Sequence, residues 1–133
     1  MRDIGKYAPF FHDGSIIGIQ HRGSAVEFFM ESAEVDPEEI RDVVLSARNT
    51  IKGILHVSGV EKIQENNQDV LVLEKKYDDG GIFDFELEKH RIEFSVDWVN
   101  FPPYPAVNEF SVIQIVAEKI WWENVPDLVD PYW

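Results

Sequence analysis

The chain of 133 residues contains no cysteine, which excludes disulfide bonds and thiolate metal sites. It also lacks any hydrophobic run long enough to cross a bilayer. The first residues, Met1 to Lys6, carry charges with no apolar stretch behind them, unlike a secretory signal. Proteins made and kept in a reducing compartment commonly lack disulfides, so we expect a cytoplasmic protein with no membrane partner.

Basic residues are scarce. Twelve Lys and Arg stand against 25 Asp and Glu, which gives a formal net charge of −13. A phosphate backbone is repelled by such a charge, so nucleic acid is not an expected partner. A basic protein would be attracted and its encounter accelerated. The alternative interpretation is that the charge serves solubility alone.

Known catalytic motifs are absent too: there is no glycine-rich phosphate loop, no nucleophile elbow and no His-Glu-x-x-His. His12, Asp13 and Ser15 are triad-type residues, but triad members normally come from separate parts of a fold. Asp13-Gly14 is typical of a turn, which His12 is placed to hydrogen-bond. The four histidines do not have metal-ligand spacing. We therefore predict no catalytic residue, no cofactor and no metal.

What the sequence does contain is period-two alternation, the pattern of a half-buried strand. It is clearest from Ile82 to Trp98. Phe83, Phe85 and Leu87 alternate with acids, and after a short polar link the apolar residues of 92–98 do the same. This pattern predicts a β-hairpin with one buried aromatic face, containing Phe83, and one acidic face.

Further strands are expected over 15–20 and 25–35, with a tight link at 21–24. Phe29 interrupts the polar face of the second strand, so it is either partly covered or exposed. Strands over 50–58 and 60–65 flank Gly59, which indicates a bend or bulge. A turn at 66–68, a strand over 69–77 and a flexible turn at 78–81 follow.

Two segments have other patterns. Asp36-Pro37-Glu38-Glu39 is typical of a helix start and predicts a short helix near residues 37–46. Within residues 110–123, Val112 to Val116 is apolar on both faces. Its Ile and Val content and the β-rich flanking sequence favour a central strand and leave a helix as the alternative. The proline-rich 100–105 is expected to be extended or turned.

Together these patterns predict one domain over residues 1–133 in the α+β class, predominantly antiparallel β. Seven to eight strands would form a sandwich or a partly open barrel with one short helix.

Acidic residues gather between Glu27 and Asp42, which suggests either a docking surface for a cationic partner or a solvated face. Trp121 and Trp122 are adjacent, so on a strand one faces the core and the other the surface. Tyr132 and Trp133 close the chain, and the tail either completes the core or joins an interface. The candidate partner-binding residues are Glu27, Glu31, Glu34, Asp36, Glu38, Glu39, Asp42 and Trp122.

The segment Phe10-Phe11-His12-Asp13-Gly14-Ser15-Ile16-Ile17-Gly18-Ile19, followed by 26–34, resembles the opening of small bacterial β-rich proteins. Some proteins with a similar Phe-His-Asp opening are thought to be immunity proteins of toxin systems. The resemblance covers about the first 35 residues, and it implies binding without chemistry.

The leading hypothesis is a non-enzymatic protein-binding domain, an immunity-type inhibitor of a basic toxin. The alternative is a small-ligand-binding β-barrel or sandwich with a pocket lined by Trp98, Trp121 or Phe94. An enzyme whose carboxylate or histidine site is assembled from distant residues ranks third.

Overall fold

The computed structural model describes residues 4–129. A 3-10 helix, η1 (Ile4–Phe11), precedes seven strands. These are β1 (Ser15–Arg22), β2 (Ala25–Glu31), β3 (Lys52–Glu65), β4 (Gln68–Asp69), β5 (Asp79–Leu87), β6 (Arg91–Val99) and β7 (Glu109–Asn124). No helix within the described range is long and apolar enough to span a membrane. The predicted antiparallel, β-rich class is confirmed, since every strand pairing is antiparallel.

Six of the strands form a closed ring in the order β2-β1-β5-β6-β7-β3, with β3 returning to β2 and β4 lying outside. The ring differs from the predicted sandwich or partly open barrel because β1 also pairs with β5. That seam is narrow: in the described chain it consists of Ser15 opposite Gly81 and Ile16 opposite Gly80. The β3–β7 ladder, by contrast, runs from Gly53↔Asn124 to Glu65↔Ile113.

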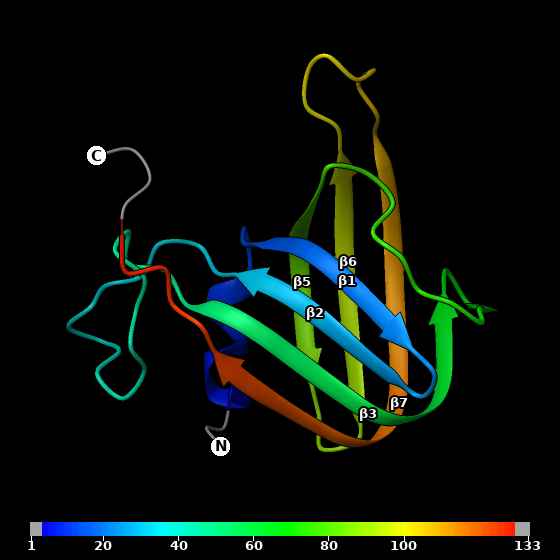
Figure 1. Ribbon diagram of the computed structural model, residues 1–133, viewed down its shortest axis with the longest axis horizontal. Helices are drawn as coiled ribbons and strands as arrows, with labels where there is room; N and C mark the ends of the chain where they lie inside the picture. The colour runs from blue at the N-terminus through cyan, green and yellow to red at the C-terminus, as the bar shows by residue number, and fades with distance from the viewer. Residues whose placement is uncertain (1–3, 130–133) are drawn as a thin grey trace.

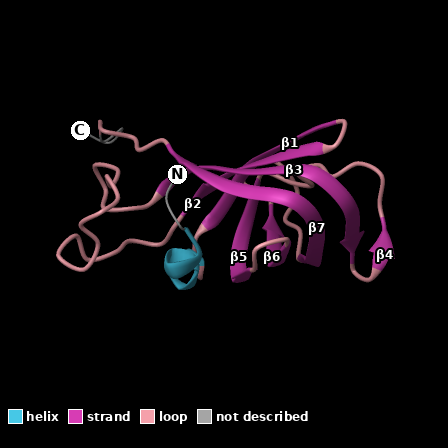
Figure 2. Ribbon diagram, turned by 90° about the horizontal axis from the view of Figure 1, so that it is seen from below, coloured by secondary structure: helices cyan, strands magenta, loops and turns pink. Residues whose placement is uncertain are grey.

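The two long strands give the barrel its shape. The first part of β7 runs beside β5 and β6, and its second part turns to run beside β3 and β2 (Figure 1). β3 curls with it, as the view from below shows (Figure 2). Gly59 has a positive φ of 63°, and the register shifts between Val60 and Lys62. The bend predicted at Gly59 is therefore confirmed, although one continuous strand passes through it.

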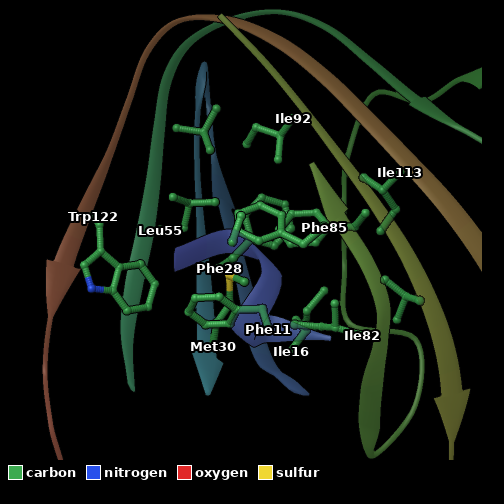
Figure 3. Packing of buried hydrophobic residues seen from close by; sticks show 14 of the residues in the cluster. Phe11, Ile16, Phe28, Met30, Leu55, Ile82, Phe85, Ile92, Ile113 and Trp122 are labelled. Carbon is green, nitrogen blue, oxygen red and sulfur yellow. The ribbon is translucent and has the colours of Figure 1, made fainter. Parts of the chain in front are cut away.

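Side chains from all six ring strands and from η1 fill the interior (Figure 3). Phe11 of η1 packs edge-on against Phe85 and Trp122, with ring centroids 5.7 and 5.6 Å away. Burial of a large aromatic or aliphatic side chain stabilises the fold by about 1.5–3 kcal/mol. The helix thus plugs the barrel with its one fully buried phenylalanine.

The helix predicted near residues 37–46 is wrong. The start signal works for only one turn: Asp36 Oδ1 accepts a hydrogen bond from the Glu38 N–H at 2.9 Å. Beyond it the chain is an irregular loop over residues 32–51 that buries Ile40 and Val43. Its backbone groups bond to distant partners, for example the Val44 carbonyl to the Asn124 side chain. A short helix is costly to nucleate, and these tertiary bonds replace its ladder.

The strand predicted over 69–77 is also wrong, because only Gln68 and Asp69 find ladder partners, on β3. The remainder is a loop held by Leu73, whose side chain is buried and whose N–H donates to His21 Nδ1 at 2.9 Å. The flexible turn predicted at 78–81 is corrected as well, since Asp79 to Gly81 begin β5.

Two other expectations are confirmed. Residues 110–123 form a strand, within β7. The hairpin over 82–98 is present as β5 and β6. One of its residues is on the opposite face from that predicted: Phe83 is 62% exposed, whereas Ile82 and Phe85 are buried. The register shifts between Ile82 and Asp84, and this bulge turns Phe83 outward.

Candidate protein-binding surface

The seven acidic candidates of 27–42 are divided between β2 and the loop 32–51. Glu27 and Glu31 lie on the outer face of β2 and are half-buried. The other five, Glu34, Asp36, Glu38, Glu39 and Asp42, are exposed on the loop. The loop extends from one end of the barrel beside η1 (Figure 1). The structure therefore separates the seven into a strand pair and a loop group.

Four of the seven have partners within the chain, and one of them, Asp36, only caps its own turn through the Glu38 N–H. Glu31 accepts a hydrogen bond from Thr50 Oγ1 at 2.7 Å. Glu27 lies 3.8 Å from His56 Nδ1. Asp42 accepts hydrogen bonds from the Lys6 ammonium, at 2.8 Å, and from the Tyr7 hydroxyl. These two hydrogen bonds, that of Lys6 above all, lower the pKa of Asp42 from 3.8 to about 2.

Glu34, Glu38 and Glu39 differ from that group. Over residues 4–129 their carboxylates make no ion pair. Glu38 and Glu39 border a hollow of about 440 Å³ between η1 and the loop, which Tyr7 and Phe10 also line. Lys6 and Arg41 lie there too, so the hollow itself is mixed in charge. The exposed loop carboxylates are available to a partner. The hollow itself favours neither a cationic nor an anionic group, because both kinds of charge line it.

Trp122 is not at the surface. It is 3% exposed and points into the barrel toward Phe11 (Figure 3). Trp121 is the half-buried outer member of the pair, stacked on His56 with ring centroids 3.9 Å apart. His56 Nε2 lies 2.8 Å from Glu123 Oε1. The choice of Trp122 as a surface candidate is therefore wrong, and the predicted tail aromatics Tyr132 and Trp133 lie outside the described residues.

A second acidic surface lies on the outer side of β5, β6 and the start of β7. Asp97 on β6 stands opposite both Gly81 on β5 and Phe110 on β7. Phe110 is 50% exposed and contacts the outward Phe83, their ring centroids 6.2 Å apart. We call this the Phe83–Phe110 face, defined by Phe83, Asp84, Asp97 and Phe110.

A hollow of about 280 Å³ adjoins this face. Its lining includes Asp13, Asp79, Asp97 and Phe83. Burial raises the pKa of Asp79 above 3.8, although a hydrogen bond from Ser15 lowers it. Asp84 and Glu93 raise the pKa of Glu86 above 4.5. Neighbouring carboxylates thus disfavour ionisation of Glu86, whereas burial is what disfavours ionisation of Asp79.

Sequence reasoning missed this face because it assigned Phe83 to the core. The acids that alternate with the aromatics of 82–98 were visible, but their neighbouring phenylalanine was placed on the wrong side. The available signal was the adjacent apolar pair Ile82-Phe83. Two neighbouring residues of a regular strand cannot both face the core.

The triad-type residues His12, Asp13 and Ser15, for which no catalytic role was predicted, have structural contacts. Asp13 has a positive φ of 66°, which confirms the turn before β1. His12 Nδ1 donates to the Phe83 carbonyl rather than to that turn. Ser15 Oγ donates to Asp79 at 3.3 Å. In the described part of the chain, no group of three or more His, Asp or Glu residues is arranged to hold a metal ion.

The interior residues named for a small-ligand pocket are packed against other side chains. Phe94 stacks on Phe85 at 4.7 Å and meets Phe28 at 4.9 Å between ring centroids. The Trp98 indole N–H donates to Ser111 Oγ at 3.0 Å. Both Phe94 and Trp98 are fully buried, and Trp121 lies on the outside. Protein side chains therefore occupy the space around these positions.

Comparison of the chain with protein-family models, with curated proteins and with solved structures gave no match.

Proposed function

We propose that this protein is a non-enzymatic binding domain whose partner is a basic protein, and that it acts as an immunity-type inhibitor of a basic toxin. The observation that carries the proposal is the excess of exposed carboxylates that have no cationic partner among residues 4–129. Glu38 and Glu39 are the clearest examples, on a loop that stands away from the barrel.

Charge of this kind steers association. An acidic surface raises the encounter rate with a basic partner and disfavours acidic competitors. Surface ion pairs contribute only about 0–1 kcal/mol each, so affinity also needs apolar contacts. The packed surroundings of Phe94 and Trp98 favour a surface partner over a small ligand inside the barrel.

The test is co-purification of the tagged protein from the cell that makes it, at 50 and 300 mM NaCl, followed by rebinding of the purified partner. We expect a basic protein that is retained at low salt and lost at high salt, because exposed charge pairs are screened. If that protein is a toxin, co-expression should suppress its toxicity. Failure to obtain a basic partner that rebinds in purified form contradicts the proposal.

Two matched double variants locate the contact. Glu38→Gln with Glu39→Gln removes two charges from the loop, and Glu61→Gln with Glu74→Gln removes two from exposed positions elsewhere. We expect the first pair to slow association with the purified partner severalfold more than the second. Equal effects would show that only net charge matters and that the loop is not the contact.

A further inference from the structure

We propose that the Phe83–Phe110 face is a docking site for a segment of a basic partner protein that carries an arginine beside an apolar residue. The inference deepens the proposed function and rests on it for the nature of the partner. It starts from the unpartnered outer side of β5, β6 and β7, where two large aromatic side chains are exposed side by side.

Exposed phenylalanines at this position are not a by-product of strand alternation. A bulge places Phe83 outward, since the register shifts between Ile82 and Asp84. Bulges commonly reorient a side chain at functional sites. Phe110 comes from a different strand, and the imidazole of His12 adds an edge-on contact to Phe83 at 5.6 Å between centroids. Three segments far apart in the sequence thus build one aromatic row.

Charge complementarity identifies the occupant. Over 79–87, 91–99 and 109–116 the only basic residue is Arg91, and it already lies 3.8 Å from Glu88 and 4.0 Å from Glu93. The same stretches carry the carboxylates Asp79, Asp84, Glu86, Glu93 and Asp97. Glu109 is also present but is paired with Lys76 at 3.3 Å, and Lys75 is near enough to Asp79 to lower its pKa, so the excess of negative charge rests on the other acids. A second copy of this chain would bring like charge against like charge, so the face disfavours self-association.

Arginine suits the surface better than lysine. Its planar guanidinium can stack on an aromatic ring and donate two parallel hydrogen bonds to a carboxylate. The hollow beside Phe83, about 280 Å³ and lined by Asp13, Asp79 and Asp97, offers both kinds of group. The neighbouring apolar residue of the partner would cover Phe110, since aromatic anchors give most of the affinity at protein interfaces.

The probe is the dipeptide acetyl-Phe-Arg-amide, titrated into the 15N-labelled full chain and followed by NMR because the contact is weak. The matched control is acetyl-Phe-citrulline-amide, which has the same shape without the charge. We expect shifts centred on the amides of Gly14, Gly81 and Phe83 with the arginine peptide and much smaller shifts with citrulline.

Variants separate the face from general acidity. Phe83→Ser should weaken binding of the arginine peptide about fivefold or more, because it removes one cation–π contact. Leu71→Ser removes an apolar side chain that is 94% exposed elsewhere, and it should leave binding unchanged. If the NMR spectrum of Phe83→Ser shows that it does not fold like wild type, Asp97→Asn is the second test variant.

Equal shifts with both peptides, shifts spread over the loop 32–51, or concentration-dependent shifts of Phe83 without peptide would each overturn the inference. The last outcome would identify the face as a self-association site. Failure here is distinguishable from failure of the proposed function. A basic partner that binds Phe83→Ser as tightly as wild type rejects this face alone. Arginine binding with no basic partner in the cell rejects the proposed function and, with it, a basic protein as the occupant of the face.

Discussion

At the scale of single residues, neighbours in one strand have opposite environments. Phe83 and Phe85 have the same side chain two positions apart, yet one is 62% exposed and the other 5%. Phe85 stacks on Phe94 with a 7° angle between the ring planes. The ring contacts of Phe83 within residues 4–129 are with the half-exposed Phe110 and His12 rings. The bulge in β5 therefore places Phe83 at the surface and leaves Phe85 in the core.

This difference predicts unequal costs for the same substitution. Phe85→Ala should lower the free energy of unfolding by about 3–5 kcal/mol, because it leaves a cavity in the barrel. Phe83→Ala should change it by about 0.5 kcal/mol or less, as exposed substitutions do. Urea unfolding of both variants measures the contrast. Similar losses would mean that β5 is regular and that Phe83 faces inward.

The sequence predicted most of the buried hairpin residues but not this exception. Alternation counted back from Phe85 places Phe83 inside, and alternation counted forward from Ile82 places it outside. Each count is correct on its own side of the bulge, because the bulge shifts the alternation by one residue. A bulge is decided by how the strand fits its partners on both sides, which a one-dimensional pattern does not contain.

Asp42 gives a pH-dependent prediction. Its pKa is lowered from 3.8 to about 2 by hydrogen bonds from Lys6 and Tyr7. A lowered folded-state pKa means that the ionised form stabilises the fold above the unfolded-state value, and that this contribution is lost as the pH falls through the folded value. We expect wild type to be more stable than Asp42→Asn at pH 6.

That difference should shrink below pH 4 and be lost as the pH falls through about 2, measured by thermal unfolding at each pH. Asp36→Asn is the matched control, because its carboxylate caps a turn rather than pairing with a lysine. A difference between wild type and Asp42→Asn that is constant from pH 6 to pH 2 would contradict the assigned hydrogen bonds.

At the scale of elements, two adjacent glycines on β5 form the seam with β1. A Cβ on Gly80 would lie 2.9 Å from Trp98 Cζ3 and from Val96 Cγ1, too close for an unshifted core. A Cβ on Gly81 would meet Asp97 O at 3.5 Å, an ordinary contact. The first glycine is needed for packing and the second is not.

Gly80→Ala should therefore destabilise the protein by about 1–3 kcal/mol through overpacking. Gly81→Ala should be neutral or stabilise it by up to about 1 kcal/mol, because alanine restricts the unfolded chain. The two melting temperatures test this directly. Equal melting temperatures would mean that Trp98 can move aside, so that β5 need not approach it closely.

Element types were predictable where alternation and burial agreed, as in β6. The β7 segment was favoured as a strand by its Ile and Val content, although its pairing with β3 was not predicted. They failed where local signals met tertiary competition. Asp36 and Pro37 do start a turn, but Ile40 and Val43 are buried by the barrel in a non-helical path. Residues 70–77 have strand composition, yet the Leu73 N–H bonds to the His21 side chain rather than to the backbone of a neighbouring strand. Propensity does not identify such distant partners.

At the scale of the whole molecule, the net charge of −13 is carried by a 15.4 kDa chain. Most carboxylates lie on the outside of the ring or on the loop 32–51. The sequence predicted the excess of acidic over basic residues and part of its distribution over the structure. The sequence pattern indicated the highest density of acidic residues at 27–42 and did not indicate the Phe83–Phe110 face. Mutual repulsion at this charge opposes the compact state.

We therefore expect the melting temperature to rise between 10 and 200 mM NaCl, as the screening length falls to about 10 Å or less. The Glu38→Gln, Glu39→Gln double variant should show a smaller rise because it begins with less repulsion. Differential scanning calorimetry measures both. A melting temperature that falls with salt would mean that attractive ion pairs such as Lys6–Asp42 outweigh the repulsion.

The narrow β1–β5 seam affects the order in which the strands pair during folding. Ser15 and Gly81 are far apart in the sequence, so their pairing bears a larger entropy cost than the hairpins formed by neighbouring strands. Because the seam has only two residue pairs to offset that cost, we expect closure of the ring to be a late step of folding and its reversal to be the easiest large opening of the native state. Each such opening briefly presents two bare strand edges, and edges of this kind recruit other chains. The clustered carboxylates along β5 and β6 then have a second effect: they keep a transiently opened barrel from pairing with its own copies.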